Sequence, residues 1–293
     1  MSYSALANPR ATKEVLDRFG HSAKHALGQN FLIEDNVVGN ILRLAGLDSD
    51  AGESLPCVIE IGPGIGTLSI ALLERAKLVA VERDADLYDV LAHTCAPYAE
   101  RFALIGADAL KLTNAQLEDA LASIDAPAPR QLVSNLPYAV AATVVLDWLE
   151  RFNFLDSMTV MVQSEVADRM SARVGTKNYG AYTVKLSLIA KVTDRFQVSR
   201  NCFMPAPHVE SAVVHIVRDS AVGDAHTIEA ACQVAEAAFA QRRKNIRNSM
   251  QSRFSRELVD ELLNACDIAP TVRGETLDPQ TYLRLGKKLL ELT

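Results

Sequence analysis

The apolar residues of this chain fall into short runs separated by segments with helical spacing. Five runs have the length and composition of buried strands, at 57–61, 78–82, 102–105, 131–134 and 158–162. Apolar positions that recur every three or four residues predict helices at 37–44, 68–76 and 86–93. This alternation predicts an α/β fold of βαβ units, with a largely parallel sheet and helices on both faces.

The second half of the chain has a different pattern. Two β-rich segments, 183–192 and 209–217, predict an antiparallel hairpin at the edge of the sheet. A polar linker at 219–224 then precedes a helix-rich remainder. We therefore expect three parts, which are an N-terminal arm over 1–22, an α/β domain over 23–218 and a small helical domain over 225–293.

Composition narrows the class of protein. The 293 residues, 49% of them hydrophobic, are enough for a large core, and no run reaches the roughly 18 apolar residues that cross a bilayer. The first ten residues have no apolar centre, so no signal peptide is expected. Five scattered cysteines without a C-x-x-C pair fit a reducing, cytoplasmic location and argue against disulfides. His21 and His25 are four residues apart, but no cluster of acids or cysteines lies beside them, so no metal is expected.

Charge is distributed unevenly along the chain. The net charge of −6 does not by itself indicate a nucleic-acid partner. The stretch 242–256, however, contains no acidic residue and these basic ones: Arg242, Arg243, Lys244, Arg247, Arg253 and Arg256. Such a run is usually a solvated helix face, but a phosphate backbone responds to a local patch and not to the net charge.

A glycine-rich loop follows the first strand. Gly62, Gly64 and Gly66 let the backbone turn sharply and approach a ligand closely. A dinucleotide fingerprint needs its third glycine one residue later, where Thr67 stands, and Pro63 removes an N–H donor that a pyrophosphate would use. An NAD-dependent oxidoreductase is therefore the weaker interpretation of this loop.

Acidic residues follow the next two strands. Glu82 ends the next strand, 20 residues after Gly62. A carboxylate at this position can accept hydrogen bonds from both hydroxyls of a ribose. Asp108 follows the third strand and can accept a hydrogen bond from an adenine amino group. Either acid alone would be an ordinary surface residue. At successive strand ends, together with the glycine loop, the two acids predict a site for a nucleoside-containing cofactor.

The sequence Asn135-Leu136-Pro137-Tyr138 follows the fourth strand. The Asn135 side-chain oxygen and the Leu136 carbonyl, which Pro137 holds in place, can accept hydrogen bonds from the two N–H groups of an exocyclic amine. These bonds favour the tetrahedral nitrogen that develops as the amine attacks a methyl group. Tyr138 offers a ring to an unstacked base, and Phe203, in a proline-rich loop, is a second candidate ring. The pattern predicts methyl transfer to a nucleobase amine, although a capped strand end with a buried Tyr138 also explains the four residues.

Five motifs that occur in this order resemble one family. They are Gly28-Gln29-Asn30-Phe31-Leu32, Glu60-Ile61-Gly62-Pro63-Gly64, Asn135-Leu136-Pro137-Tyr138, Phe203-x-Pro205-x-Pro207-x-Val209-x-Ser211-Ala212-Val213 and Gln241-Arg242-Arg243-Lys244-x-x-Arg247-Asn248-Ser249. From about residue 24 to residue 290, the chain resembles the ribosomal RNA small-subunit adenine dimethyltransferase A family.

The resemblance implies a fold, a reaction and a set of residues. The fold would be a Rossmann-like class I methyltransferase sheet with a small C-terminal helical domain that binds the RNA substrate. The reaction would be S-adenosylmethionine-dependent dimethylation of the N6 amines of two adjacent adenines near the 3′ end of small-subunit (16S) rRNA, in a maturing subunit. The implied cofactor residues are Asn30, Leu32, Gly62, Gly64, Glu82, Asp108 and Asn135. The implied catalytic residues are Asn135, Leu136, Pro137, Tyr138 and Phe203, and the implied RNA contacts are Lys24, Arg242, Arg243, Lys244 and Arg247. We expect a cytoplasmic monomer.

Departures from the family pattern and two other interpretations remain open. Ser134 stands where the family usually has glycine and is expected to crowd the target base, and His25-Ala26 replaces a more basic pair. An erythromycin-resistance type methyltransferase of large-subunit rRNA shares the catalytic-domain motifs, although the Phe203 loop and the helical tail favour the small-subunit enzyme. A nucleic-acid-binding factor related to the mitochondrial transcription factors would keep the fold and work without methyl transfer.

Overall fold

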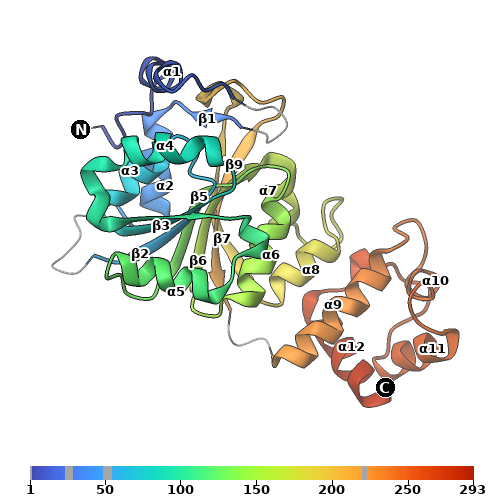
Figure 1. Cartoon of the computed structure of the whole chain (residues 1–293). Helices are drawn as coiled ribbons and strands as arrows, with labels where there is room; N and C mark the ends of the chain where they lie inside the picture. The colour runs from blue at the N-terminus through green and yellow to red at the C-terminus, as the bar shows by residue number, and fades with distance from the viewer. Residues whose placement is uncertain (1, 24–28, 49–54, 220–222) are drawn as a thin grey trace. The chain divides into compact units, whose positions relative to one another are not determined.

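Seven strands form one sheet in the order β4-β3-β2-β5-β6-β9-β7 (Figure 1). The computed structural model describes residues 2–23, 29–48, 55–219 and 223–293. The strands of this sheet are β2 (Cys57–Ile61), β3 (Lys77–Glu82), β4 (Phe102–Gly106), β5 (Gln131–Asn135), β6 (Ser157–Gln163), β7 (Ala190–Val198) and β9 (Ser211–Arg218). The strands from β2 to β6 pair in parallel, and β9 pairs antiparallel with β6. The α/β sheet predicted from the sequence is confirmed.

Helices cover both faces of the sheet. One face carries α2 (Asp35–Leu44), α3 (Thr67–Leu73) and α4 (Tyr88–Thr94), and the other carries α5 (Asn114–Ser123) and α6 (Ala141–Arg151) (Figure 1). As a result, β2 is buried at every position and β3 at every position but its first. This two-sided burial explains why the central strands are continuous apolar runs without polar alternation.

The edge of the sheet differs in part from the prediction. β7 and β9 are neighbours, as the predicted hairpin requires, but β7 begins at Ala190. The residues before it form helix α8 (Ala181–Ser187). The strand predicted at 183–192 is therefore wrong over its first half. Val184 and Leu188 are both fully buried, and their spacing of four residues places them on one helical face.

The N-terminal residues fold onto the sheet domain. Helix α1 (Pro9–Arg18) begins after Asn8, whose side chain caps the first turn. The carboxylate of Asp35, at the start of α2, accepts the backbone N–H groups of Tyr3 at 2.9 Å and Ser4 at 2.8 Å. These bonds tie the beginning of the chain to α2.

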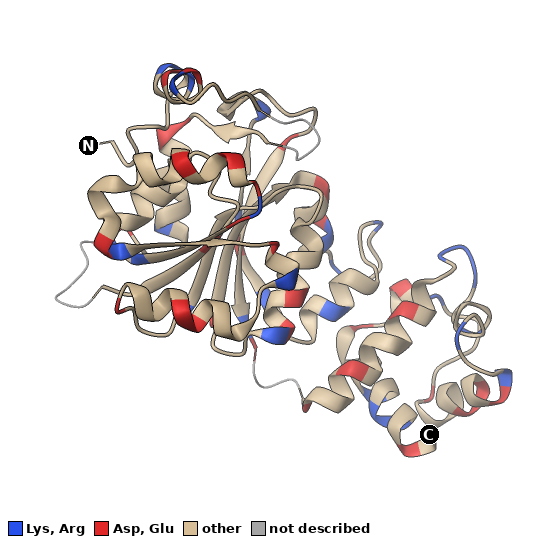
Figure 2. Cartoon of the chain, viewed as in Figure 1, with Lys and Arg blue, Asp and Glu red and all other residues tan. Residues whose placement is uncertain are grey.

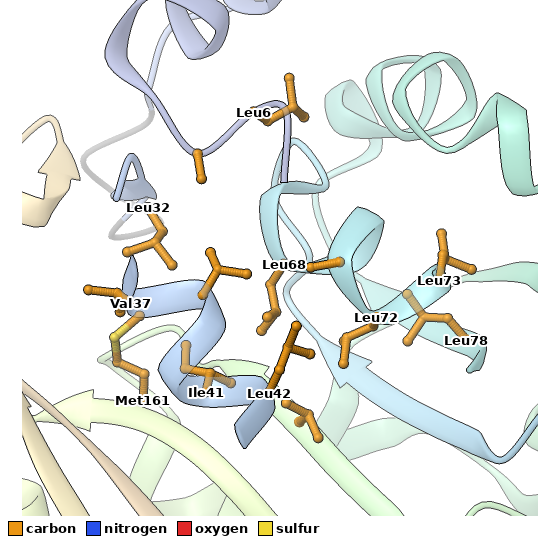
Figure 3. Packing of buried hydrophobic residues seen from close by; sticks show 14 of the residues in the cluster. Leu6, Leu32, Val37, Ile41, Leu42, Leu68, Leu72, Leu73, Leu78 and Met161 are labelled. Carbon is orange, nitrogen blue, oxygen red and sulfur yellow. The ribbon is translucent and has the colours of Figure 1, made fainter. Parts of the chain in front are cut away.

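A hydrophobic cluster joins this N-terminal segment to the sheet. Leu6 points into the cluster that also holds Leu32, Leu42 and Leu68, from three other elements (Figure 3). Leu32 belongs to the short strand β1 (Phe31–Leu32), which pairs antiparallel with β8 (Phe203–Met204). Segments from both halves of the sequence therefore share one core.

Contacts divide the chain into two compact units. Unit 1 comprises Met1–Ser164 and Thr193–Val217, and unit 2 comprises Glu165–Val192 and Arg218–Thr293. Residues 165–192 thus group with the C-terminal helices and the N-terminal arm groups with the sheet, whereas the sequence predicts three parts with boundaries at 22/23 and near residue 218.

Unit 2 is helical and has its own core. Its helices are α7 (Ser164–Met170), α8, α9 (Ala225–Phe239), α10 (Ile246–Met250), α11 (Arg256–Ala265) and α12 (Pro279–Leu292). Helices α9 and α12 pack so closely that a Cβ on Gly286 would lie 2.4 Å from the backbone nitrogen of Ala231. Tyr179, Val184 and Leu188 lie in the same core as these two helices. None of the helices in the described part of the chain is both long enough and apolar enough to cross a membrane.

Candidate functional site

A cavity opens where the strand order of the sheet reverses. From β2 the order runs to β3 and β4 on one side and to β5 and β6 on the other. The pairing of β2 with β5 ends at Ile59 and Leu132, before either strand ends, so their carboxyl ends diverge. Ligands of such sheets bind at this point. The cavity has a volume of about 210 Å³, whereas one water needs roughly 10–15 Å³ by such a measure. The space is therefore large enough for an organic ligand.

The loop between β2 and α3 forms one wall of the cavity. Gly62 and Gly64 have φ angles of 69° and 62°, which are strained for residues with a side chain. A Cβ on Gly62 would lie 3.1 Å from the ring of Pro137, and a Cβ on Gly64 would lie 3.4 Å from the ring of Phe31. The glycines therefore leave the loop backbone open to a ligand where no side chain fits.

Glu82, at the end of β3, lines the cavity and is buried. Its carboxylate accepts the backbone N–H of Asp84 at 2.8 Å and that of Gly64 at 3.4 Å. Burial raises the pKa of this carboxyl group, and the backbone N–H groups oppose that shift because they favour the ionised form. A carboxylate held in this way can accept hydrogen bonds from the two hydroxyls of a ribose.

Glu60 is a second carboxylate in the cavity wall, and it is not among the site residues predicted from the sequence. It is 1% exposed, and the Ser69 hydroxyl donates to it at 2.6 Å. Burial raises its pKa to about 8, the Ser69 hydrogen bond opposes this, and the nearby Glu82 adds to it. The signal was present in the sequence, since an acidic residue inside an apolar strand is rarely buried without a partner or a ligand.

Polar groups from three other loops also line the cavity. Asn30 and Gln29 line it from the segment that leads into β1, and the Gln29 amide donates to the carboxylate of Asp84 at 2.7 Å. Asp108 lines it after β4, with its carboxylate 3.8 Å from the guanidinium of Arg83. Gln29 and Arg83 are further lining residues that the sequence analysis did not assign.

The loop after β5 also lines the cavity. Leu136 is buried, and its N–H donates to the carbonyl of Met161 at 3.1 Å, which fixes the loop to β6. The Tyr138 hydroxyl lies 2.5 Å from the Ser211 hydroxyl on β9, and burial raises the pKa of the phenol. Asn135 lines the same cavity, and its side-chain amide forms no hydrogen bond with any residue that the structure describes.

The structure brings most of the predicted residues together. The predicted cofactor residues all line this cavity: Asn30, Leu32, Gly62, Gly64, Glu82, Asp108 and Asn135. The predicted catalytic residues that line it are Asn135, Leu136, Pro137 and Tyr138. Phe203 does not line it, because its ring is 3% exposed and lies in the hydrophobic core beside β1. The assignment of Phe203 to the site therefore rests on the resemblance alone.

Two of the predicted RNA contacts are engaged within unit 2. Arg242 donates to the backbone carbonyl of Lys177 at 2.6 Å. Arg247 forms paired hydrogen bonds with the carboxylate of Asp260 at 2.5 and 2.6 Å. Both arginines therefore stabilise this unit, whatever else they bind. Lys24 and the pair His25-Ala26 lie outside the described residues.

The other two predicted contacts are solvent-exposed. Arg243 and Lys244 lie on the loop after α9, where Lys and Arg residues occur close together (Figure 2). Within the described ranges, neither forms an ion pair or a side-chain hydrogen bond. Arg253, by contrast, pairs with Glu236. Arg243 and Lys244 are therefore available to an anionic partner.

Comparison with known proteins identifies the family. A model of the ribosomal RNA adenine dimethylase family matches residues 20–290. The chain belongs to this family. This adenine dimethylase family member is 38% identical to the ribosomal RNA small subunit methyltransferase A of Geobacillus thermodenitrificans, over 98% of both chains. It is 37% identical to the protein of the same name from Corynebacterium glutamicum, over 97% of this chain and 96% of that one.

Solved structures share the fold of this dimethylase family member. A dimethyladenosine transferase from Plasmodium falciparum superposes with a TM-score of 0.71 at 21% identity, over 89% of this chain and 98% of that one. The 23S rRNA methyltransferase ErmE superposes with a TM-score of 0.62 at 22% identity, over 89% and 99%. In the part of the dimethylase that the structure describes, no group of three or more His, Cys, Asp or Glu side chains is placed to hold a metal ion.

Proposed function

We propose that this chain uses S-adenosylmethionine to dimethylate the N6 amines of two adjacent adenines near the 3′ end of small-subunit rRNA, in a maturing ribosomal subunit. The observation that carries the proposal is the single cavity at the point where the strand order reverses. It combines Glu82, Asp108 and the glycine loop with the segment 135–138. The names of the relatives, which specify the small subunit, support the choice of substrate.

The cavity fits S-adenosylmethionine, a cationic nucleoside with an amino-acid tail. Glu82 would hold the ribose hydroxyls and Asp108 the adenine amine, while Gly62 and Gly64 admit the tail close to the backbone. Thr67 also lines the cavity, and its buried hydroxyl has no hydrogen-bond partner among the described residues. A polar group left in this state is typical of a site completed by a ligand. When bound, the cofactor supplies an electrophilic methyl group.

The residues of the loop after β5 would prepare the acceptor amine. The Asn135 side-chain oxygen and the Leu136 carbonyl would accept hydrogen bonds from its two N–H groups and favour a tetrahedral nitrogen. Tyr138 would stack on the target base, an interaction typically worth about 1–3 kcal/mol per base. The Ser211 hydroxyl holds the Tyr138 ring through its phenol oxygen. The base must leave its stack to reach these residues.

The two units would divide the work between chemistry and RNA binding. Unit 1 contains the whole cavity, so we assign it the cofactor and the transfer step. We assign phosphate contacts in unit 2 to Arg243 and Lys244. Arg173 and Lys177 are exposed cations on the segment that Arg242 binds, and they extend this surface. We further propose that the enzyme acts as a cytoplasmic monomer.

Asn135→Ala tests the proposed reaction. Small subunits lacking the modification would be incubated with the protein and labelled S-adenosylmethionine, and the rRNA digested to nucleosides for mass spectrometry. The wild type should yield N6,N6-dimethyladenosine. The variant should be slower by roughly 100-fold or more, because it lacks one of two groups that stabilise the transition state.

Asn114→Ala, at an exposed position on α5, is the matched control and should leave the rate unchanged. In a parallel assay on unmodified large subunits, methylated product there and none on small subunits would favour the erythromycin-resistance type of enzyme. Tight binding to the subunit without any methylated product would favour a binding factor.

A further inference from the structure

Ser134 joins the two loops that form the walls of the cavity. It is fully buried, and its hydroxyl donates to the carbonyl of Ile61 at 2.5 Å. Ser134 immediately precedes Asn135, and Ile61 immediately precedes Gly62. The hydrogen bond therefore connects the base of the catalytic loop (135–138) to the base of the cofactor loop (62–66).

The Ser134 hydroxyl takes the place of a backbone donor to the Ile61 carbonyl, at the point where β2 and β5 stop pairing. The N–H of Gly62 donates to Val81 on β3 at 2.9 Å. The carbonyl of Ile61 and the N–H of Gly62 belong to the same peptide group and point in opposite directions. Since the N–H points toward β3, the Ile61 carbonyl points toward β5. The β2–β5 pairing, however, ends at Ile59 and Leu132. The Ser134 side chain supplies the donor that the diverging strand no longer provides.

A packing contact lies directly beside this hydrogen bond. A Cβ on Gly62 would meet the Cγ and Cδ atoms of Pro137 at 3.1 Å, so the two loops pass each other with no room for a side chain. The hydrogen bond and this contact together fix the spacing between the loops. Ser134 is fully buried and does not line the cavity. The expectation that it crowds the target base is therefore wrong.

We propose that Ser134 is a positioning residue for methyl transfer, whose hydroxyl sets the distance between the cofactor loop and Asn135. The inference rests on the proposed function. In that reaction the methyl donor is held by one loop and the acceptor amine by the other, and the nitrogen must approach the methyl carbon in line. A misplacement of about 1 Å can cost on the order of 100-fold in rate.

Ser134→Ala removes the hydroxyl and keeps the Cβ. We expect its single-turnover methylation of unmodified small subunits, at saturating S-adenosylmethionine, to be at least 10-fold slower than that of the wild type. Its dissociation constant for S-adenosylhomocysteine, measured by calorimetry, should stay within about threefold, because Ser134 does not touch the cavity.

Thr12→Val is the matched control for a simple loss of stability. Thr12 is also fully buried, and its hydroxyl donates to the carbonyl of Leu6 at 2.9 Å, in the N-terminal segment. The control should lower the Tm and leave the single-turnover rate within twofold of wild type. A Ser134→Ala rate within twofold of wild type, or a slowing matched by Thr12→Val, would overturn the positioning role while the proposed function stood. A wild type that forms no product would overturn the proposed function itself.

Discussion

Two buried carboxylates, Glu60 and Glu82, lie in the wall of the cavity. Glu82 accepts backbone N–H groups that favour its charge, whereas among the described residues Glu60 has a single side-chain donor, the neutral Ser69 hydroxyl. A fully buried carboxyl group with so little support prefers its neutral form near pH 7. A proton on Glu60 therefore lowers the negative charge of the cavity wall, and a cationic ligand would favour its release.

Glu60→Gln tests this protonation through stability. The pKa of Glu60 is about 8 in the folded protein and near 4.5 in the unfolded chain, so the folded state binds more protons between these values. Its contribution to stability is therefore greatest below pH 4.5 and is lost as the pH rises toward 8, at about 1.4 kcal/mol per unit of pKa shift. The variant lacks this loss, so its Tm relative to wild type should be higher at pH 8.5 than at pH 5.5.

Thermal unfolding of both proteins at the two pH values measures this difference. Glu118→Gln, at an exposed position on α5, is the control and should show the same Tm difference at both pH values. A pH-independent difference for Glu60→Gln would mean that Glu60 is ionised in the folded protein throughout.

The N-terminal segment is tied to α2 by the carboxylate of Asp35 and by the packing of Tyr3. Asp35 accepts two backbone N–H groups from Tyr3 and Ser4 and also occupies the first turn of α2, where a negative charge is favourable. The ring of Tyr3 fills the space beside Gly39, where a Cβ would lie 2.2 Å from it. Leu6 then enters the core that underlies β1 and its cavity-lining residue Leu32.

Asp35→Ala should release this segment. Hydrogen bonds to a charged group contribute about 1.5–3 kcal/mol, so we expect a loss of this order in stability. Hydrogen exchange should accelerate at the amides of Tyr3 and Ser4. Asp89→Ala removes an exposed acid from the first turn of α4 and is the control for the helix effect alone. Unchanged exchange at Tyr3 and Ser4 in Asp35→Ala would show that the hydrophobic contacts hold the segment without the carboxylate.

The sequence predicts the central elements well and the peripheral ones less well, for physical reasons. β2 and β3 are buried on both faces, so their apolar runs are unambiguous. Residues 183–192 are ambiguous because Val184, Leu186 and Leu188 alternate like a strand, while the pair Val184 and Leu188 also has helical spacing. Tertiary packing decided in favour of helix. Helix α1 had a local signal, Asn8 before Pro9, that the polar composition obscured.

The site follows the same logic. Residues such as Glu82 and Asn135 were predictable because each stands at a carboxyl end of a parallel strand, and those ends converge. Phe203 does not stand at the carboxyl end of a parallel strand. Its position depends on the pairing of β8 with β1, and β1 is too short to be recognised from a pattern. The Ser134 bond was also beyond prediction, since it depends on where the β2–β5 pairing stops.

At the scale of the whole molecule, a negative net charge coexists with a local cationic surface. The loop after α9 presents Arg243 and Lys244 to solvent, and the Arg242 side chain secures its base to the segment before α8. Arg247 is paired with Asp260, so reversing its charge would set two carboxylates against each other inside unit 2. A test of RNA binding should therefore leave Arg247 intact.

The double variant Arg243→Glu/Lys244→Glu should weaken binding to small-subunit rRNA. Log affinity falls with log salt concentration, and each lost phosphate contact makes this slope less negative by about 1. We therefore expect the slope of the double variant to be less negative than that of the wild type by about 2. Binding titrations between 50 and 200 mM salt measure it. The control is Arg101→Glu/Lys111→Glu, an equal change of charge at exposed positions of unit 1. Equal effects of the two double variants would show a response to net charge and not to this surface.

Unit 2 is built from two separate segments of the chain, and this restricts how chimaeras between relatives can be made. Its core is built from 165–192 and 218–293, with the last strands of the sheet between them in the sequence. A chimaera that exchanges only the tail after residue 218 would keep Tyr179, Val184 and Leu188 of this core from one parent and take the rest of it from the other. Buried positions such as Val184 and Leu188 would then face a foreign α9 and α12. If unit 2 recognises the RNA, as we propose, substrate preference passes between relatives only when both segments are exchanged together. A single crossover before residue 165 achieves this only by carrying the strands within 193–217 along with them.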